Sequence, residues 1–333
     1  MKKRVKIPLI IIGVIIGLLA VAVIGVFIWW NSMLAKAGYK EDWSDADGTV
    51  ITDIAYGKKP SNTFDLYIPA TASKDRPQAL MLYIHGGAWT GGDKSEEAFD
   101  CRRFAKEGYI TATMDYTVIN PNNHQASVMS MLDEIQACVT RIKEYTDSLG
   151  YHIDRMSTSG ISAGGHLSML YALKCADQSP IPIVFIAQRV GPANLAKMFG
   201  ISKEDIDEVA ADIKAGRPNE KKTEIDKTIF VVTGKTMTPQ MYTKEIIDSL
   251  LLSSSPVTYI GPNSVPAAMA YGEKDGTVHP MHPQEIDSLY KAYNIPHVLM
   301  MFPNSGHLLA DDPDYSQRYI AEVKKFCKKY FGY

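Results

Sequence analysis

Cysteine is scarce in this sequence, and its four cysteines lie far apart along the chain. No two of them have the C-x-x-C spacing that zinc sites and dithiol redox motifs use, so we predict neither a metal site nor a redox centre. Their expected role is packing in the interior. We predict no disulfide, because four cysteines allow several pairings and the sequence selects none of them. The residues concerned are Cys101, Cys138, Cys175 and Cys327.

A strong excess of charge is also missing, since the formal net charge is only -2. Outside the first six residues there is no dense run of lysine and arginine that could neutralise a phosphate backbone, which excludes nucleic acid as an expected partner. What the chain does have is size and apolar content. With 333 residues, of which 46% are hydrophobic, it can build the packed core of an enzyme domain.

One long apolar run is present, and it lies near the N-terminus. Lys2, Lys3, Arg4 and Lys6 precede an uncharged stretch over residues 7–30. At about 1.5 Å per residue, a helix of this length crosses a hydrocarbon core roughly 30 Å thick. The basic cluster favours a cytoplasmic N-terminus. We therefore expect residues 1–37 to form a cytoplasmic tip, a single membrane anchor and a short linker, with the rest of the chain outside the cytoplasm.

A cleaved secretory signal is the alternative interpretation of this segment. Ala35-Lys36-Ala37 offers small residues in the A-x-A arrangement of a cleavage site. The apolar run is, however, longer than the roughly 7–15 residues usual for the apolar region of a signal peptide. Both interpretations predict export, either as a single-pass protein of the cell membrane or as a secreted protein.

From Gly38 onward, short apolar stretches alternate with amphipathic ones, which is typical of an α/β fold with a mostly parallel sheet covered by helices. We expect one catalytic domain over residues 38–333. The helical spacing is clearest over residues 131–145 and near the C-terminus, over 319–330. The expected core strands cover residues 79–84, 109–114, 155–159, 181–187, 267–271 and 297–302.

The stretch from about residue 194 to about residue 255 interrupts this alternation, because it is more charged and mostly helical in pattern. Ser202 has the residue type of a helix N-cap, and Pro239 after Thr238 indicates a second helix start. We predict a helical cap inserted into the sheet domain.

Gly160-Ile161-Ser162-Ala163-Gly164 fits the pattern G-x-S-x-G. In that motif small residues allow a tight turn from a strand into a helix, which exposes the serine hydroxyl. A predicted strand precedes the motif, and helical spacing follows it from His166. We predict Ser162 as a catalytic nucleophile.

A second glycine-rich segment, His85-Gly86-Gly87-Ala88-Trp89, follows a predicted strand upstream of the serine. It matches the H-G-G loop, whose backbone N–H groups hold the negative oxygen that develops during acyl transfer. We predict the amides of Gly86, Gly87 and Ala163 as the donors of this oxyanion hole. His85 is expected to brace the loop rather than to act as a base.

A serine hydroxyl needs a histidine to take its proton and a carboxylate to orient that histidine. Only His307 lies between the last predicted strand and the C-terminal helix, so we predict it as the base. Asp275 leaves the preceding strand at a turn and is the predicted acid, with Glu273 as its competitor. His279 and His282 lie in a proline-containing loop and are assigned no role.

Taken together, these motifs resemble the esterase/lipase branch of the α/β-hydrolase superfamily, including hormone-sensitive-lipase-like and feruloyl/acetyl-xylan-esterase-like proteins. The resemblance extends from about Thr63 to the C-terminus. Ala88 departs from the pattern, because it replaces the third glycine of the H-G-G-G loop and is expected to narrow access near the acyl group. The motifs that match in order are His85-Gly86-Gly87 with Trp89, Gly92-Asp93-Lys94, Asp115-Tyr116, Gly160 to His166, Gly272 with Asp275, and Gly306-His307.

The resemblance implies an eight-stranded sheet and hydrolysis of carboxylic esters through an acyl-enzyme, without a cofactor. The expected partner is a small-molecule ester, carrying a short acyl or an aryl group, or an acetyl group on a carbohydrate. Two alternatives remain open, namely a serine peptidase of the same fold and an inactive binding protein tethered to the membrane. The sequence gives no prediction of oligomeric state.

Overall fold

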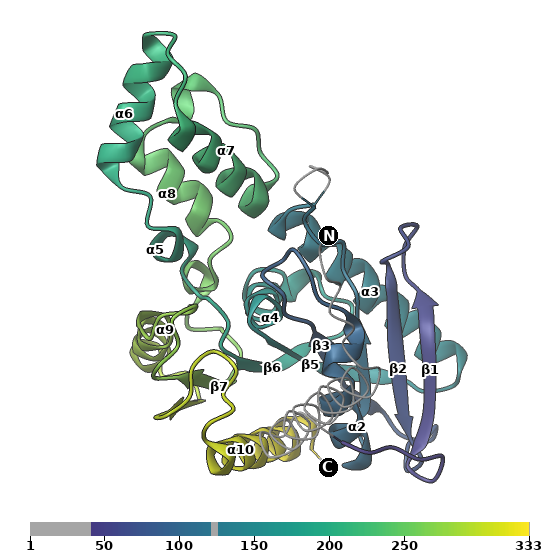
Figure 1. Ribbon diagram of the computed structural model, residues 1–333. Helices are drawn as coiled ribbons and strands as arrows, with labels where there is room; N and C mark the ends of the chain where they lie inside the picture. The colour runs from purple at the N-terminus through teal and green to yellow at the C-terminus, as the bar shows by residue number, and fades with distance from the viewer. Residues whose placement is uncertain (1–40, 121–125, 333) are drawn as a thin grey trace, which may run out of the picture.

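The computed structural model describes residues 41–120 and 126–332, which form an eight-stranded sheet flanked by helices (Figure 1). The strand order is β1-β2-β4-β3-β5-β6-β7-β8. All pairs from β4 to β8 are parallel, whereas β1 pairs antiparallel with β2, and β2 antiparallel with β4. The expected α/β fold with a mostly parallel sheet is confirmed. The strands are β1 (Gly48–Ala55), β2 (Thr63–Pro69), β3 (Gln78–Ile84), β4 (Ile110–Met114), β5 (Ile153–Ile161), β6 (Ile183–Arg189), β7 (Ala267–Gly272) and β8 (His297–Phe302).

The central strands form because their residues are apolar or β-branched and can be buried on both faces. Every residue of β3 and β4 is buried, which explains why their sequences read as continuous apolar runs. Sequence analysis did not identify β1 and β2. Strand β1 lies at the sheet edge, and only Ile54 among its residues is buried, so it lacks the apolar signal of the central strands.

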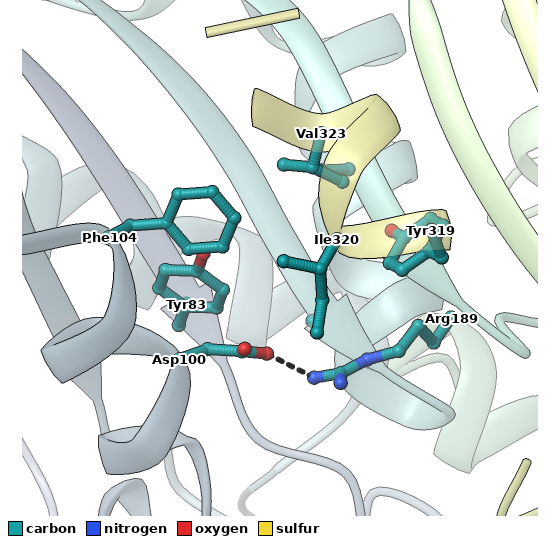
Figure 2. Close-up of a pocket in the computed structure, with 9 residues that line it drawn as sticks. Tyr83, Asp100, Phe104, Arg189, Tyr319, Ile320 and Val323 are labelled. Carbon is teal, nitrogen blue, oxygen red and sulfur yellow. Dashed lines mark hydrogen bonds and ion pairs between the residues drawn. The ribbon is translucent and has the colours of Figure 1, made fainter. Parts of the chain in front are cut away.

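Five longer helices pack around the sheet, namely α2 (Ala98–Lys106), α3 (Val128–Ser148), α4 (Ala163–Lys174), α9 (Met281–Ala292) and α10 (Pro313–Phe331). Helix α3 starts at Ser127, whose side chain and Ser130 form a reciprocal capping box. The side chains of α2 and α10 line a common cavity beneath β3 and β6, so these two helices share one face of the sheet (Figure 2). Helix α10 begins six residues earlier than the periodicity suggested, with Pro313 in its first turn.

Four helices between β6 and β7 stand away from the sheet and form what we call the helical insertion, residues 195–252 (Figure 1). Ser202 caps α6, with its Oγ accepting a hydrogen bond from the Asp205 amide at 3.0 Å. The predicted helix start at Pro239, after Thr238, is where a short 3₁₀ helix begins (Pro239–Met241), whereas the α-helix α8 begins only at Lys244. The reason is that Tyr242 leaves helical geometry, at φ -81° and ψ 66°, so the turn does not continue into the helix. The four helices of the helical insertion are α5 (Leu195–Phe199), α6 (Lys203–Lys214), α7 (Glu220–Thr233) and α8 (Lys244–Leu252).

A buried histidine holds the chain where it leaves the sheet for the helical insertion. The Nδ1 atom of His282, on α9, accepts hydrogen bonds from the amides of Ala193 at 3.3 Å and Asn194 at 3.2 Å. The Asn194 side chain is also bound to the carboxylate of Glu285 on the same helix. Because Nδ1 is an acceptor in this arrangement, the imidazole of His282 must be neutral.

A second buried histidine holds the chain where it returns to the sheet. His166, on α4, bonds the carbonyl oxygen of Ser254 through Nε2 at 2.8 Å. A carbonyl oxygen only accepts, so Nε2 carries the proton. Within the described residues Nδ1 of His166 is buried and has no partner, so a second proton there would lack an acceptor. Both connections of the helical insertion therefore depend on neutral imidazoles.

None of the helices in residues 41–120 and 126–332 is long and apolar enough to cross a bilayer. The predicted anchor at residues 7–30 and the cleavage site at residues 35–37 lie outside the described residues.

We expect the protein to lose stability in mild acid because of these two histidines. Burial lowers the pKa of His166 and of His282 to about 4, from an ordinary value of 6.5. His282 also faces Glu285 and Asp275, which act to raise its pKa, and His279 and Lys197, which act to lower it. Folding therefore favours the neutral rings. The free energy of unfolding is unaffected by them above about pH 6.5, and it falls as the pH is lowered from there towards 4, because protonation favours the unfolded chain. Over this pH range each ring lowers the free energy of unfolding by on the order of 3 kcal/mol.

The measurement is the free energy of unfolding in urea at about pH 7.5 and about pH 4.5. The variant His282→Gln keeps an acceptor but does not titrate, so it should lose less stability between the two conditions than the wild type. His152→Gln is the control, because the side chain of His152 is 62% exposed. This variant should lose as much stability between the two pH values as the wild type. An equal loss of stability between the two pH values in all three proteins would contradict the prediction.

Candidate active site

The three residues predicted as nucleophile, acid and base all follow strands of the parallel part of the sheet. Ser162 comes directly after β5, Asp275 follows β7, and His307 follows β8. The carboxyl ends of parallel strands lie at one edge of a sheet, where loops from different strands meet. Residues separated by 145 positions in the sequence are brought together in this way.

Ser162 sits in a strained turn between β5 and α4. Its backbone has φ 55° and ψ -119°, a conformation that residues with side chains rarely adopt. The turn lies so close to the end of β3 that a Cβ atom at Gly160 or Gly164 would come within 2.5 or 1.9 Å of the Ile84 carbonyl oxygen. Glycine is therefore required at both positions. The Ser162 amide donates to the carbonyl oxygen of Arg189 on β6 at 2.9 Å, which fixes the turn from the other side.

The side chains of Ser162, His307 and Asp275 form one continuous hydrogen-bonded chain. His307 Nε2 lies 2.8 Å from Ser162 Oγ, and His307 Nδ1 lies 2.8 Å from Asp275 Oδ2. The carboxylate of Asp275 is an acceptor only, so Nδ1 carries the proton and Nε2 is left to accept the serine hydroxyl. This arrangement can transfer the Ser162 proton to His307 while the serine oxygen attacks an electrophile.

Asp275 is held as a charged group although it is only 3% exposed. Burial acts to raise the pKa of this carboxyl, but hydrogen bonds from His307 and from the amides of Val278 and Thr277 outweigh burial, and the pKa is lowered. The two amides donate to Oδ1 at 2.9 and 2.8 Å. Its competitor Glu273 is exposed and makes no hydrogen bond to His307.

The loops that carry the acid and the base are joined to each other through their backbones. The amide of Lys274 donates to the Ser305 carbonyl at 3.0 Å. Gly272 approaches the other loop so closely that a Cβ atom would lie 2.4 Å from the Gly306 carbonyl oxygen. The separation of Asp275 and His307 is therefore set by backbone contacts next to both residues.

Asp312 braces the histidine loop, a role that sequence analysis missed. Its carboxylate accepts from the amide and the side chain of Asn304, both at 2.9 Å, and from Ser305 Oγ at 2.7 Å. No motif in the sequence marks this residue. Its position before Pro313, at the start of α10, would suggest only a helix boundary.

The predicted oxyanion loop lies against the serine. A Cβ atom at Gly86 would be 3.5 Å from the Cβ of Ser162, and Gly87 has φ 98°, which favours glycine. Ala163 is the first residue of α4, whose N-terminal amides have no partners inside the helix. In the part of the chain that the structure describes, no acceptor is found for the amides of Gly86, Gly87 or Ala163. These N–H groups remain available for a ligand oxygen beside Ser162.

On the face of the sheet covered by α2 and α10 lies a buried group of acidic and basic side chains, of which Figure 2 shows Asp100 and Arg189. Arg189, whose carbonyl oxygen holds the Ser162 amide, binds Asp100 of α2 at 2.5 Å and lies 3.4 Å from Glu97. Asp100 also binds Arg103 at 2.5 Å. Burial raises the pKa of Glu97 to about 8, and Arg189 only partly offsets this effect. The charges tie β6 to α2 directly below the proposed site.

The two other histidines near the site, His279 and His282, have structural roles and belong to no metal-binding group among the described residues. Within residues 41–120 and 126–332 there is no group of three or more His, Cys, Asp or Glu side chains that could hold a metal ion. His279, which received no role from the sequence, is exposed and accepts from the Met281 amide at the start of α9. His282, also without a predicted role, holds the helical insertion as described above.

The sequence model of the BD-FAE family matches residues 64–289. The chain belongs to the BD-FAE family. This match runs from within β2 to within α9 and includes the serine turn, the H-G-G loop and Asp275. The resemblance to α/β-hydrolase esterases, inferred from the motifs, is thereby confirmed at the level of the family.

Similar proteins of known name include esterases and a formamidase. A probable isoprenylcysteine alpha-carbonyl methylesterase ICME of rice (Oryza sativa subsp. japonica) is 31% identical over 127 residues, or 38% of this chain and 29% of the rice protein. Kynurenine formamidase of Salmo salar is 29% identical over 133 residues, or 39% of this chain and 42% of that protein. The matches to this BD-FAE family member thus span less than half the length of these curated relatives.

Solved structures support the same fold. A truncated carbohydrate esterase from gut microbiota matches with a TM-score of 0.66 at 15% identity, covering 87% of this chain and 99% of that one. Esterase B from Lactobacillus rhamnosis, in a C6-C4 SN3 inhibited form, matches with a TM-score of 0.62 at 17% identity, covering 93% and 96%. At such low identity these matches establish the α/β-hydrolase fold alone.

We expect Asp100→Ala to destabilise the protein, because the Asp100 carboxylate is the nearest one to two buried arginines, Arg189 and Arg103. Arg189 keeps Glu97 at 3.4 Å and Arg103 keeps Glu41 at 3.7 Å, so the cost should lie below the roughly 3–5 kcal/mol typical of an uncompensated buried charge, but above about 1 kcal/mol. Urea unfolding measures the difference. The control is Glu322→Ala, which breaks an exposed pair with Lys325 and should cost less than about 1 kcal/mol. A similar small cost for both variants would show that the buried charges do not stabilise the fold.

Proposed function

We propose that this protein is a serine hydrolase that cleaves carboxylic esters through an acyl-enzyme, with Ser162 as nucleophile, His307 as base and Asp275 as acid. The single observation that carries the proposal is the continuous hydrogen-bonded chain from Ser162 Oγ through His307 to Asp275. The amides of Gly86, Gly87 and Ala163 lie beside this chain and are proposed as the oxyanion hole.

Acylation follows from this arrangement. As Ser162 Oγ forms a bond to the ester carbonyl carbon, its proton passes to His307 Nε2, and the carbonyl oxygen becomes an oxyanion that accepts hydrogen bonds from the loop amides. The charge of Asp275 stabilises the imidazolium that results. His307 then gives the proton to the leaving alcohol oxygen as the bond between that oxygen and the carbonyl carbon breaks.

Deacylation repeats these steps with water. His307 takes a proton from water while the water oxygen bonds to the acyl carbon, and it returns that proton to Ser162 Oγ as the bond between Oγ and the acyl carbon breaks and the acid is released. The neutral form of His307 is needed at the start of both half-reactions. The buried carboxylate of Asp275, charged because its pKa is lowered, keeps the ring in the tautomer that both steps require.

Support for ester substrates comes from the relatives and from the fold. The similar proteins carry the names methylesterase and esterase, and the structural neighbours include a carbohydrate esterase. We propose short acyl or aryl esters, including acetyl groups on carbohydrate, as the substrate class. A kynurenine formamidase among the relatives makes an aryl formamide a useful comparison substrate.

We also propose that the catalytic domain acts outside the cytoplasm. This proposal depends on the basic and apolar pattern of residues 2–30. Fractionation of cells producing the full chain tests it. Recovery from washed membranes, with the domain accessible to external protease, agrees with a single-pass anchor, whereas release into the medium agrees with signal cleavage and a cytoplasmic location contradicts both.

Ser162→Ala should abolish turnover of p-nitrophenyl acetate, with a fall in kcat of at least about 10³-fold. A fluorophosphonate probe should label the wild type at Ser162, because only an activated serine reacts with it. Ser288→Ala is the control, since Ser288 is exposed and its hydroxyl bonds only within α9. Its activity and labelling should equal those of the wild type. A loss of less than about tenfold in Ser162→Ala would remove Ser162 from the mechanism.

A substrate panel separates the remaining alternatives. We expect kcat/KM to be highest for nitrophenyl esters of short acids, lower for long acyl chains, and low for peptide anilides. Faster cleavage of the peptide substrates would favour a peptidase of the same fold. A folded wild type that neither reacts with fluorophosphonate nor turns over any ester would favour a binding protein.

A further inference from the structure

The H-G-G loop is supported from beneath by Asp115 and Tyr116, which follow β4. Strands β3 and β4 are parallel neighbours, and Ile84 pairs with Met114 at their carboxyl ends. Continuing this register by two residues brings Tyr116 beside Gly86. The ring of Tyr116 is 1% exposed, so its hydroxyl must find partners inside the protein.

Those partners are the carbonyl oxygens of the glycine loop itself. The Tyr116 hydroxyl lies 3.1 Å from the His85 carbonyl oxygen and 3.2 Å from the Gly86 carbonyl oxygen. Burial raises the pKa of Tyr116, which keeps the phenol protonated and therefore able to donate. A single hydroxyl thus contacts two successive peptide groups of the loop.

The two peptide groups that Tyr116 contacts are the ones that carry the proposed oxyanion donors. The peptide containing the His85 carbonyl also contains the Gly86 N–H, and the peptide containing the Gly86 carbonyl contains the Gly87 N–H. In a planar trans peptide the C=O and N–H bonds point in opposite directions. Holding both carbonyls on the Tyr116 side therefore turns both N–H groups away from it.

We propose that Tyr116 is a positioning residue of the active site, whose hydroxyl orients the Gly86 and Gly87 amides by binding the carbonyls of their peptide groups. The inference rests on the proposed function, because that function makes the Gly86 and Gly87 amides the oxyanion donors. Tyr116 does not touch the reacting atoms in this scheme. Its effect is to fix the donors before substrate arrives, which matters because pre-oriented dipoles need no reorganisation during the reaction.

His85 adds to the same restraint. Its Nδ1 lies 2.8 Å from the Gly86 carbonyl oxygen, and its ring stacks on Tyr116 with centroids 4.1 Å apart and planes 5° apart. Burial lowers the pKa of His85, which favours the neutral ring. Tyr116 therefore holds the Gly86 carbonyl directly, through its hydroxyl, and indirectly, by fixing the imidazole that binds the same oxygen.

Asp115 holds the far end of the loop. Its carboxylate accepts from the Lys94 amide at 2.7 Å, while Lys94 Nζ lies 3.4 Å from the other oxygen of the same carboxylate. The two residues after β4 thus fix both ends of the segment from His85 to Lys94. Of the two, only Tyr116 contacts the peptide groups whose N–H bonds face the site.

The test is Tyr116→Phe, which keeps the ring and its stacking on His85 but removes the hydroxyl. We expect kcat for p-nitrophenyl acetate to fall about tenfold, less than the 10²–10³-fold typical of deleting a donor outright, with KM changed less than about twofold. The inhibition constant of phenylboronic acid, which forms a tetrahedral adduct with serine, should rise by a similar factor. The pH profile of kcat should keep its shape, since the Ser162, His307 and Asp275 contacts are unchanged.

Tyr290→Phe is the matched control. Tyr290 is also 1% exposed and also donates to a main-chain carbonyl, that of Val265 at 3.2 Å, but it lies outside the proposed catalytic groups. Its kcat and boronate inhibition should match the wild type. Unchanged kcat in Tyr116→Phe, or an equal loss in both variants, would overturn the inference while leaving the proposed function intact. A wild type without turnover or fluorophosphonate labelling would overturn both.

Discussion

The contact between the serine turn and the end of β3 is the constraint on which the rest of the site depends. Gly160 and Gly164 press against the Ile84 carbonyl so closely that no side chain fits, and Ser162 between them takes a strained backbone conformation. The chain leaves β3 at that same carbonyl and continues into His85 and Gly86. One close approach of two backbones therefore places the serine hydroxyl beside the amides of Gly86 and Gly87, for which the described residues offer no acceptor. The strain is tolerated because the Ser162 amide donates to the Arg189 carbonyl of β6 and the surrounding sheet holds the turn in place.

The remaining groups are placed by backbone contacts between loops rather than by their own side chains. The loops after β7 and β8 are joined at Lys274 and Ser305 and meet at Gly272, while Asp312 fixes the second loop against α10. Each proposed catalytic side chain thus has little freedom of its own. This arrangement suits general acid–base chemistry, in which a displacement of about 1 Å can reduce the rate by a large factor.

Several titratable groups are buried around the site, and their surroundings set their charge. Asp275 stays ionised because His307 and two amides bind it, whereas His166 and His282, at the two connections of the helical insertion, are neutral because burial lowers their pKa. Arg189 is paired with Asp100 below the serine turn. The helical insertion therefore meets the rest of the domain through hydrogen bonds of neutral imidazoles and also through the ion pair of Lys197 with Glu285 at 3.0 Å.

The sequence by itself determined the α/β class, the central strands, and the residue types of the site, because these depend on local signals. Apolar runs mark β3 and β4, and glycine spacing marks the turn at Ser162. The turn that follows the predicted strand over residues 267–271 was the local signal that favoured Asp275 over Glu273 as the predicted acid. Local signals failed at β1, which lies at the sheet edge with one buried residue, and they did not indicate that the helix starting at Pro239 is only one short 3₁₀ turn. Tertiary structure alone decided what supports the site: Tyr116 against the glycine loop, Asp312 against the histidine loop, and His282 at the helical insertion. These contacts join side chains to backbone groups that are distant or not distinguished by residue type, so no spacing in the sequence records them.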